Sequence, residues 1–430
     1  MYNLKIEADN ILRTLHQNGF EAYFVGNYPF VKKNNSINSS EKLKIKSIDI
    51  ITNATLDDIK NLFTVSSVNT DYYNKFATIE VFIKQNKINF KIFHAAEYTN
   101  IITGKTRQVT TVNEILNGFS FLIDSIMIDI DGNFINYSNK KYSSYDSISL
   151  KSLLSNGNFR EKLLENPMMI FDLCVHASNI PYSINNTYFK IIGNNKNYIN
   201  YIKLSCIQKY MDKILMSKNA FVGLSIIKNN LLDLSYNGLK IFKFLEYCSE
   251  KDLMKFSKFN SSVDIISRWA YLFTRVPRDK QLELLQYLQL PYEKKIIWLL
   301  TNFELVNESN YKLSIYNSKE SLKNISNKID IFLLHEMFQK LTNTWKCLDE
   351  SKIDICNKII DTICSRPFFD YQIAYNDEEI YKLIELENKV DLSKGKDIFL
   401  KEIIMKSKHP DDEEYLLLLK ESILKSLEEN

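Results

Sequence analysis

One acidic side chain stands on an expected strand, KSIDIIT, where metal-dependent chemistry would need two. The stretch KIKSIDIITNATLDDIKNLF, residues 44–63, is typical of a strand, a turn and a helix start, and it carries Asp49 with Ser47 two positions earlier. Two carboxylates at that spacing would point to one face of a strand and could share divalent cations. A serine hydroxyl is neutral and replaces an anionic ligand poorly. Asp49 is therefore either a lone metal ligand or a solvated or capping acid at a strand end, and we favour the second interpretation.

The spacing of the other acids and histidines does not indicate a metal site. Asp129 and Asp131 have the two-residue spacing, but Gly132 follows them, and Asp-Gly is a hairpin turn signal. Three histidines are isolated and lack metal-ligand spacing: His94, His176 and His335. We expect packing or surface roles for these histidines.

The elements that would position Asp49 mix helix and strand over the first 140 residues. IEADNILRTLHQNG predicts a helix that ends at Gly19, and EAYFVG predicts the strand after it. The polar stretch 32–44 predicts a loop, and KSIDIIT predicts a strand whose following helix is capped by Thr55. Two hairpins are expected, one from FATIEVFIK with INFKIFH and one within FLIDSIMIDIDGNFINY.

The chain beyond about residue 150 has helical periodicity. In EKLLENPMMIFDLCVHAS the apolar residues Leu164, Met168, Phe171 and Val175 recur at three- and four-residue spacing, which predicts a helix that buries one face. Later segments such as DIISRWAYLF and EEYLLLLKESILKSL repeat this pattern.

Bulk composition describes an ordinary globular chain. It has 430 residues, 45% of them hydrophobic, and a net charge of +3, so several domains are expected and no global basicity indicates nucleic acid. Six dispersed cysteines without a C-x-x-C motif, and a start without an apolar signal region, predict a reduced, cytoplasmic protein. No apolar run approaches the ~20 residues of a membrane span, so no membrane partner is expected.

Several motifs occur in an order that matches a known family. GFEAYFVGN resembles a strand leading into a G-G-x-x-R-D loop, and SIDIITNATLDDIKNLF resembles a D-x-D-x-x-T strand and helix. GFSFLIDSIMIDIDGNFINY is similar to an R-R-D-F-T-x-N segment, and LLENPMMIFDLCVHAS to an E-D-x-x-R-x-x-R helix. The chain thus resembles the class II tRNA nucleotidyltransferases, which include the CCA-adding enzymes and bacterial poly(A) polymerases, along most of its length.

The resemblance implies an α+β fold. A nucleotidyltransferase-like mixed α/β head with a small sheet would be followed by an all-α neck, body and tail. The implied boundaries are 1–145 for the head, 146–215 for the neck, 216–310 for the body and 311–430 for the tail.

The resemblance also locates the family's chemical positions in this sequence, and most of them are altered. The metal-binding carboxylates correspond to Ser47, Asp49 and Asn89, of which Asp49 keeps its acid. The phosphate loop begins at Gly26 and Asn27 and continues as Tyr-Pro-Phe-Val, so we expect bulky side chains in the phosphate site. The remaining vestigial nucleotide-binding positions are Asp124, Glu165, Asn166, Met169 and Asp172.

These substitutions predict a catalytically degenerate relative, not an enzyme and without a cofactor, that binds tRNA or another structured RNA or serves as a scaffold for a protein. The candidate RNA-binding residues are Lys32, Lys33, Lys42, Lys44 and Lys46. One alternative is an active nucleotidyltransferase that uses Mg²⁺ and CTP or ATP, with Asp49 and a relocated acid such as Asp124 or Asp129. Another alternative is a non-catalytic subunit of an active paralogue.

Overall fold

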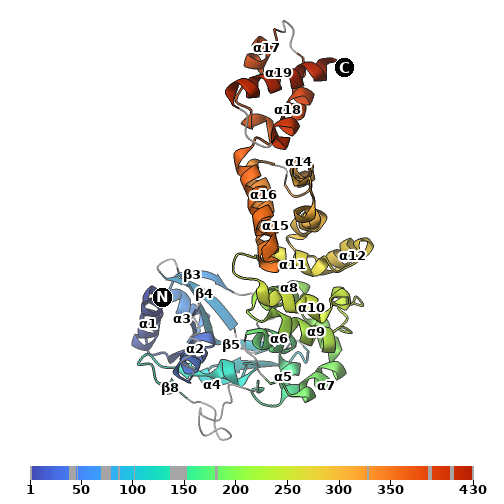
Figure 1. Ribbon diagram of the computed structural model, residues 1–430. Coiled ribbons are helices and arrows are strands. Elements are labelled where there is room, and N and C mark those ends of the chain that lie inside the picture. The colour runs from blue at the N-terminus through green and yellow to red at the C-terminus, as the bar shows by residue number, and fades with distance from the viewer. Residues whose placement is uncertain are drawn as a thin grey trace. The chain divides into compact units, whose positions relative to one another are not determined.

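The computed structural model describes residues 2–37, 45, 47–68, 79–85, 88–100, 102–135, 153–179, 183–326, 329–385, 390–406 and 411–428. The chain divides into two compact units, Met1–Phe242 and Lys243–Asn430. Figure 1 shows a mixed sheet with helices in the first unit and helices in the second, which confirms the predicted α+β class. The four domain boundaries implied by the resemblance stay predictions.

A mixed sheet forms the first part of unit 1, called here the sheet part (residues 2–135). In the described residues its strand order is β3-β4-β5-β2-β1-β7-β8, with β6 paired to β5. The strands are β1 (Ala22–Val25), β2 (Asp49–Thr55), β3 (Val65–Val68), β4 (Ile79–Gln85), β5 (Ile88–Thr99), β6 (Thr106–Val109), β7 (Met127–Ile128) and β8 (Phe134–Ile135). β2 and β5 run parallel, whereas the other pairs described are antiparallel. Both predicted hairpins are confirmed, as β4–β5 and β7–β8.

Helices cover both faces of this sheet. They are α1 (Tyr2–Gln17), α2 (Asn27–Ile37), α3 (Leu56–Leu62), α4 (Val112–Leu116) and the 3₁₀ turn η2 (Leu122–Ser125). Alternate strand residues face opposite sides, so Ile50 and Ile92 pack with α1 and α3, whereas Ile51 and Phe93 pack with α4. Thr55 caps α3 in a capping box with Asp58, as its position predicted.

The second part of unit 1, called the helical part (residues 153–242), is a helix bundle. Its elements are α5 (Phe159–Glu165), α6 (Met169–Asn179), α7 (Asn186–Asn194), η4 (Lys196–Tyr201), α8 (Leu204–Met216) and α9 (Ala220–Asn230). The prediction of one helix over residues 161–178 is wrong, because Pro167 cannot continue α5 and the chain restarts at Met169. As a result Met169 and Phe171 are buried, while Leu164 and Val175 are half-buried.

Unit 2 is built from helices. They are η5 (Lys243–Tyr247), α10 (Glu250–Met254), η6 (Lys255–Lys258), α11 (Ile265–Phe273), α12 (Arg278–Leu288), α13 (Glu293–Asn302), η7 (Phe303–Asn307), α14 (Tyr311–Ser321), η8 (Leu322–Asn324), α15 (Ile331–Leu348), η9 (Glu350–Lys352), α16 (Ile353–Ser365), η10 (Asp370–Gln372), α17 (Asp377–Leu383), α18 (Ser393–Met405) and α19 (Asp412–Glu428). Its fully buried aromatic side chains include Trp269 and Phe273 of α11, which pack against Phe244. None of the described helices is both long and apolar enough to cross a membrane.

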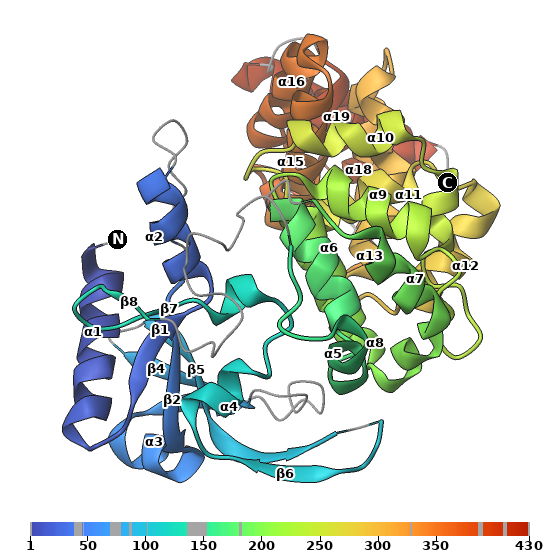
Figure 2. The same ribbon diagram turned by 90° about the horizontal axis from the view of Figure 1, so that it is seen from below.

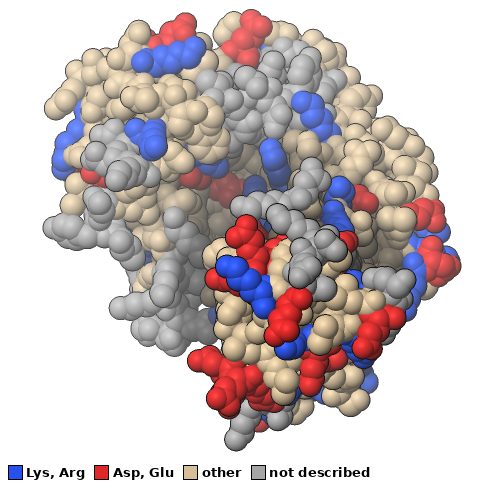
Figure 3. Space-filling model, turned by 90° about the horizontal axis from the view of Figure 1, so that it is seen from above, with Lys and Arg blue, Asp and Glu red and all other residues tan. Residues whose placement is uncertain are grey.

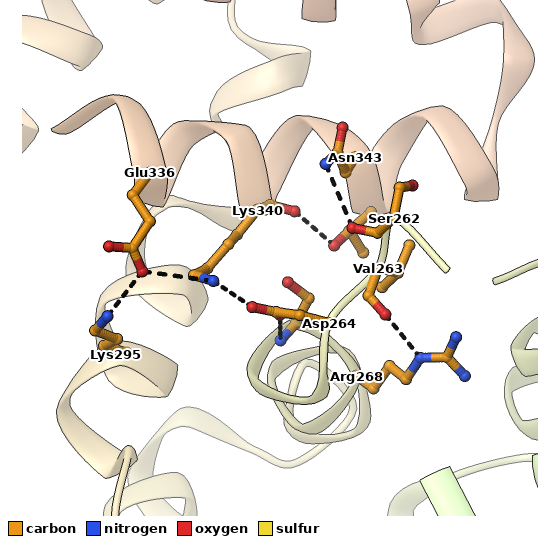
Figure 4. Close-up of polar contacts among 10 residues, drawn as sticks. Ser262, Val263, Asp264, Arg268, Lys295, Glu336, Lys340 and Asn343 are labelled. Carbon is orange, nitrogen blue, oxygen red and sulfur yellow. Dashed lines mark hydrogen bonds and ion pairs between the residues drawn. The ribbon is translucent and has the colours of Figure 1, made fainter. Parts of the chain in front are cut away.

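An ionic network joins three helices of unit 2 (Figure 4). Asp264 caps the N-terminus of α11 and also binds the ammonium of Lys340 on α15. Glu336, one turn earlier on α15, lies 3.5 Å from Lys340 and 2.8 Å from Lys295 on α13. These contacts fix α15 against α11 and α13.

Candidate functional site

Asp49 at the start of β2 is paired with a lysine from the neighbouring strand. β2 and β5 are parallel with Ile50 opposite Ile92, so the preceding residues of each strand, Asp49 and Lys91, lie side by side. The Nζ atom of Lys91 is 3.2 Å from Oδ2 of Asp49, and the two side chains are 27% and 17% exposed. The positive charge beside this carboxylate is therefore supplied by the chain itself.

Neither of the other two positions of the predicted metal site places a second negative charge beside Asp49. Ser47 is exposed and precedes β2, which begins three residues later than a strand over KSIDIIT would. Asn89 is an exposed residue of β5 opposite Lys84 of β4. Among the described residues no group of three or more His, Cys, Asp or Glu side chains lies close enough to hold a metal ion.

The relocated acids considered as substitutes have other partners. Oδ2 of Asp124 lies 3.0 Å from Nε2 of His176. Asp129 accepts hydrogen bonds from the backbone and side-chain nitrogens of Asn133, as expected for a turn residue. These bonds to Asn133 keep the pKa of Asp129 below its usual value, although partial burial acts in the opposite direction.

The segment after Gly26 is a helix, and not the phosphate loop that the resemblance implied. Gly26 has φ +70°, a conformation that favours glycine, and a Cβ atom there would lie 3.3 Å from the Asp49 carboxylate. α2 starts at the next residue, and Pro29 is tolerated in its first turn. Tyr28, Phe30 and Val31 are buried, and Tyr28 belongs to the core under the sheet. Tyr28 therefore packs inward, and the prediction that bulky side chains fill the phosphate site stays a prediction.

The loop predicted over residues 32–44 is in part helical, since α2 continues to Ile37. Lys32 lies on this helix and donates a 2.8 Å hydrogen bond to the carbonyl of Gly132 in the β7–β8 turn. The side chain of Lys33 and the whole of Lys42, Lys44 and Lys46 lie outside the described residues. An RNA-binding role for these lysines stays a prediction.

The predicted nucleotide-reading positions lie where the sheet part meets the helical part. Asn166 donates a 3.1 Å hydrogen bond to the hydroxyl of Ser120, and that hydroxyl donates a 3.1 Å bond to Asp172 on α6. Met169 is fully buried, and Glu165 pairs with Lys162 at 3.0 Å. The structure thus brings Asn166, Asp172 and Asp124 into one polar cluster, whereas Gly26 and Asn27 belong to the Asp49 region.

Burial and the charges of this cluster shift the pKa values of Asp172 and His176. Burial raises the pKa of Asp172, and the Asp124 carboxylate raises it further. Burial would lower the pKa of His176, but Asp124 outweighs burial, so the pKa of the imidazole is raised. The cluster therefore favours a proton on His176.

Sequence reasoning did not single out Lys91 or Ser120, and it treated His176 as an isolated histidine, whereas the structure pairs it with Asp124. Lys91 follows Asn89 by two residues and so shares its face of β5, but its contact with Asp49 depends on the pairing of strands 40 residues apart. His176 follows Asp172 by four residues, a spacing that places both on one face of a helix and could have indicated the pair.

Unit 2 has a hollow of about 290 Å³ where cationic and aromatic side chains meet. It is lined by Lys255, Tyr271, Thr274, Arg275, Phe303, Glu304, Trp345, Leu348 and Asp349. The rings of Phe303 and Trp345 are 5.1 Å apart, and Nε of Arg275 lies 3.0 Å from Asp252. Aromatic and cationic groups occur together in sites for single-stranded nucleic acid, whereas in this lining Glu304 and Asp349 balance the charges of Lys255 and Arg275.

Comparison with known proteins finds CCA-adding enzymes. No protein-family model matches the sequence. A CCA-adding enzyme of Staphylococcus haemolyticus is 24% identical over 270 residues, which is 62% of this chain and 62% of that protein, so the match spans less than two thirds of the relative.

Solved structures match over nearly the whole chain. The CCA-adding enzyme of Bacillus stearothermophilus in complex with CTP has a TM-score of 0.67 and 16% identity, with 99% of each chain covered. The CCA-adding enzyme of Thermotoga maritima complexed with tRNA has a TM-score of 0.54 and 14% identity, with 99% of this chain and 98% of that chain covered. The chain therefore has the fold of these enzymes.

Proposed function

We propose that this chain is a member of the CCA-adding tRNA nucleotidyltransferase family that does not add nucleotides and acts as an RNA-binding protein. The fold and the sequence relative support the family. The relative complexed with tRNA supports the class of partner. The loss of catalysis is carried by a single observation, the ion pair between Asp49 and Lys91.

The residues at this site do not fit the two divalent cations of a nucleotidyltransferase. Such a site needs several anionic oxygen ligands within about 2.5 Å of each ion. Here Asp49 supplies one carboxylate, and Ser47 and Asn89 occupy the positions of the family's other metal-binding carboxylates. The ammonium of Lys91 already lies 3.2 Å from Asp49. A divalent cation placed on Asp49 would face the positive charge of Lys91 at close range, so its binding should be strongly disfavoured.

A direct assay tests the loss of catalysis. The purified protein is incubated with a tRNA lacking its 3′ CCA, labelled CTP or ATP, and Mg²⁺ or Mn²⁺. We expect no incorporation above a mock purification, while the Staphylococcus haemolyticus enzyme serves as the positive control. Incorporation that is abolished by Asp49→Asn and retained in Asp57→Asn, an exposed acid on α3, would refute the proposal and favour the enzyme alternative.

RNA binding is tested separately by gel shift with the same tRNA at increasing salt. The net charge is small, and on the face shown in Figure 3 Lys and Arg side chains are interspersed with Asp and Glu. Binding must therefore depend on local contacts, and phosphate contacts make the affinity fall steeply with salt. We expect salt-sensitive binding; no shift even at low salt would contradict the RNA role and favour a protein partner, such as an active paralogue.

The hollow in unit 2 is a specific candidate for one such contact. Lys255 supplies a cation to its lining, and Trp345 supplies an aromatic ring. We expect Lys255→Glu to weaken tRNA binding several-fold at low salt and to flatten the salt dependence. Lys251→Glu on the adjacent α10, outside the lining of the hollow, is the matched control, and an equal loss in both variants would argue against a contact at the hollow.

A further inference from the structure

Three side-chain bonds join the sheet part of unit 1 to its helical part at one place. Ser120 donates to Asp172, Asn166 donates to Ser120, and His176 pairs with Asp124 of η2. Figure 2 shows the strands of the sheet part and helix α6 of the helical part as separate layers of unit 1. These bonds therefore connect elements of different layers. The junction is polar and partly exposed: the side chains of His176 and Asp124 are 24% and 29% exposed.

The junction places one imidazole close to two carboxylates. Asp172 lies one turn before His176 on α6, so both project from the same face of the helix. Nε2 of His176 is 3.0 Å from Asp124, and the edge of the Phe121 ring packs against the imidazole at a centroid distance of 5.4 Å. The ring is therefore held in place from the sheet side by both a charge and an aromatic contact.

We propose that His176 is a protonation-dependent tie between the sheet part and the helical part of unit 1. As an imidazolium, it neutralises Asp124 directly and reduces the repulsion between Asp124 and Asp172. As a neutral imidazole, it leaves the Asp124 and Asp172 carboxylates near each other without the positive charge of the ring, while the two bonds through Ser120 remain. This proposal goes beyond the proposed function and does not depend on it.

The groups that face His176 determine the direction of the effect. They are Asp124 from η2, Asp172 from α6 itself and Lys213 from α8, and Tyr210 of α8 is a hydrogen-bond partner of Asp172. Burial and Lys213 disfavour the proton on His176, but the two acids outweigh them and the pKa is raised above its ordinary value near 6.5. A group with a raised folded-state pKa stabilises the fold fully below its unfolded pKa, and this contribution is lost as pH rises through the folded pKa. The tie should hold below the ordinary histidine pKa and weaken as pH rises through the raised pKa of His176.

Thermal unfolding across pH 5.5–9 tests the tie. We expect His176→Gln to melt about 2–4 °C below the natural protein at pH 6, and the difference to vanish by pH 9. His335→Gln on α15, which has no part in the junction, is the control for a histidine replaced elsewhere in the chain. A difference between His176→Gln and the natural protein that is constant over the whole range would overturn the proposal.

A second measurement covers the case in which His176→Gln does not fold. The chain has five histidines, so the NMR titration of ¹³C-labelled imidazoles can be followed for each. We expect the His176 signal to titrate above pH 6.5 in the natural protein and nearer 6.5 in Asp124→Asn. A His176 signal that titrates at or below pH 6.5, or that Asp124→Asn leaves unmoved, would refute the tie. Neither result depends on whether the protein incorporates nucleotides.

Discussion

The ammonium of Lys91 is matched to the carboxylate of Asp49 across two parallel strands, and both side chains are mostly buried. Removing the cation should leave a partly buried charge less well compensated. We expect Lys91→Met to lower the free energy of unfolding by about 1–3 kcal/mol in urea titrations. The double variant Lys91→Met with Asp49→Asn should recover part of that loss. Lys84→Met on the exposed side of β4 is the control, and an equal loss in Lys84→Met would contradict the argument.

His94 on β5 is a buried histidine with 2% of its surface exposed. Burial lowers its pKa, although a hydrogen bond to the Ala95 carbonyl acts in the opposite direction. The unfolded chain takes up a proton as pH falls below about 6.5 while the folded chain resists it, so stability should decrease with acidification. We expect His94→Phe to reduce the loss of melting temperature between pH 7 and pH 5. An unchanged slope in this variant would show that His94 does not contribute.

At the scale of elements, α6 and α9 cross at a glycine. A Cβ atom on Gly223 would lie 2.1 Å from Oγ of Ser178 and 2.9 Å from the Cys174 carbonyl, so the helices can approach only without it. We expect Gly223→Ala to destabilise unit 1 by about 1–3 kcal/mol. Gly193 on α7 has no atom within 4 Å of its Cβ position, and Gly193→Ala should stabilise by about 0.5 kcal/mol. Chemical denaturation measures the change in the free energy of unfolding in each variant. Changes of the same sign in Gly223→Ala and Gly193→Ala would refute the packing argument.

Local signals predicted many elements correctly, and the errors have identifiable causes. The Thr55 cap and the two hairpins depend on a few adjacent residues, and they were predicted correctly. The loop prediction for residues 32–44 relied on polar composition, but α2 is anchored by its buried first turns and by the bond from Lys32 to Gly132. Helical periodicity alone overlooked Pro167. The Asp49–Lys91 pair could not be predicted, since it requires the register of β2 on β5.

At the scale of the whole molecule, each unit has its own buried core and its own key contacts. Asp264 caps α11 and binds Lys340, and that hydrogen bond helps lower its pKa although burial acts to raise it. We expect Asp264→Ala to shift only the calorimetric transition of unit 2, by the loss of a cap and a charge-assisted bond worth about 1–3 kcal/mol. Gly223→Ala should shift only the transition of unit 1. One transition that moves equally in both variants would show that the units unfold together.

Strand β1 has consequences for how the protein is made. It lies between β2 and β7, and its partner in β7 is Ile128, more than 100 residues further along the chain. Domains fold as units while the ribosome extends the chain. A nascent polypeptide that ends before Met127 would hold β1 with one edge open, and an open edge can pair with another chain. A pause of the ribosome before it reaches Met127 would therefore leave this edge open for longer and raise the risk of aggregation.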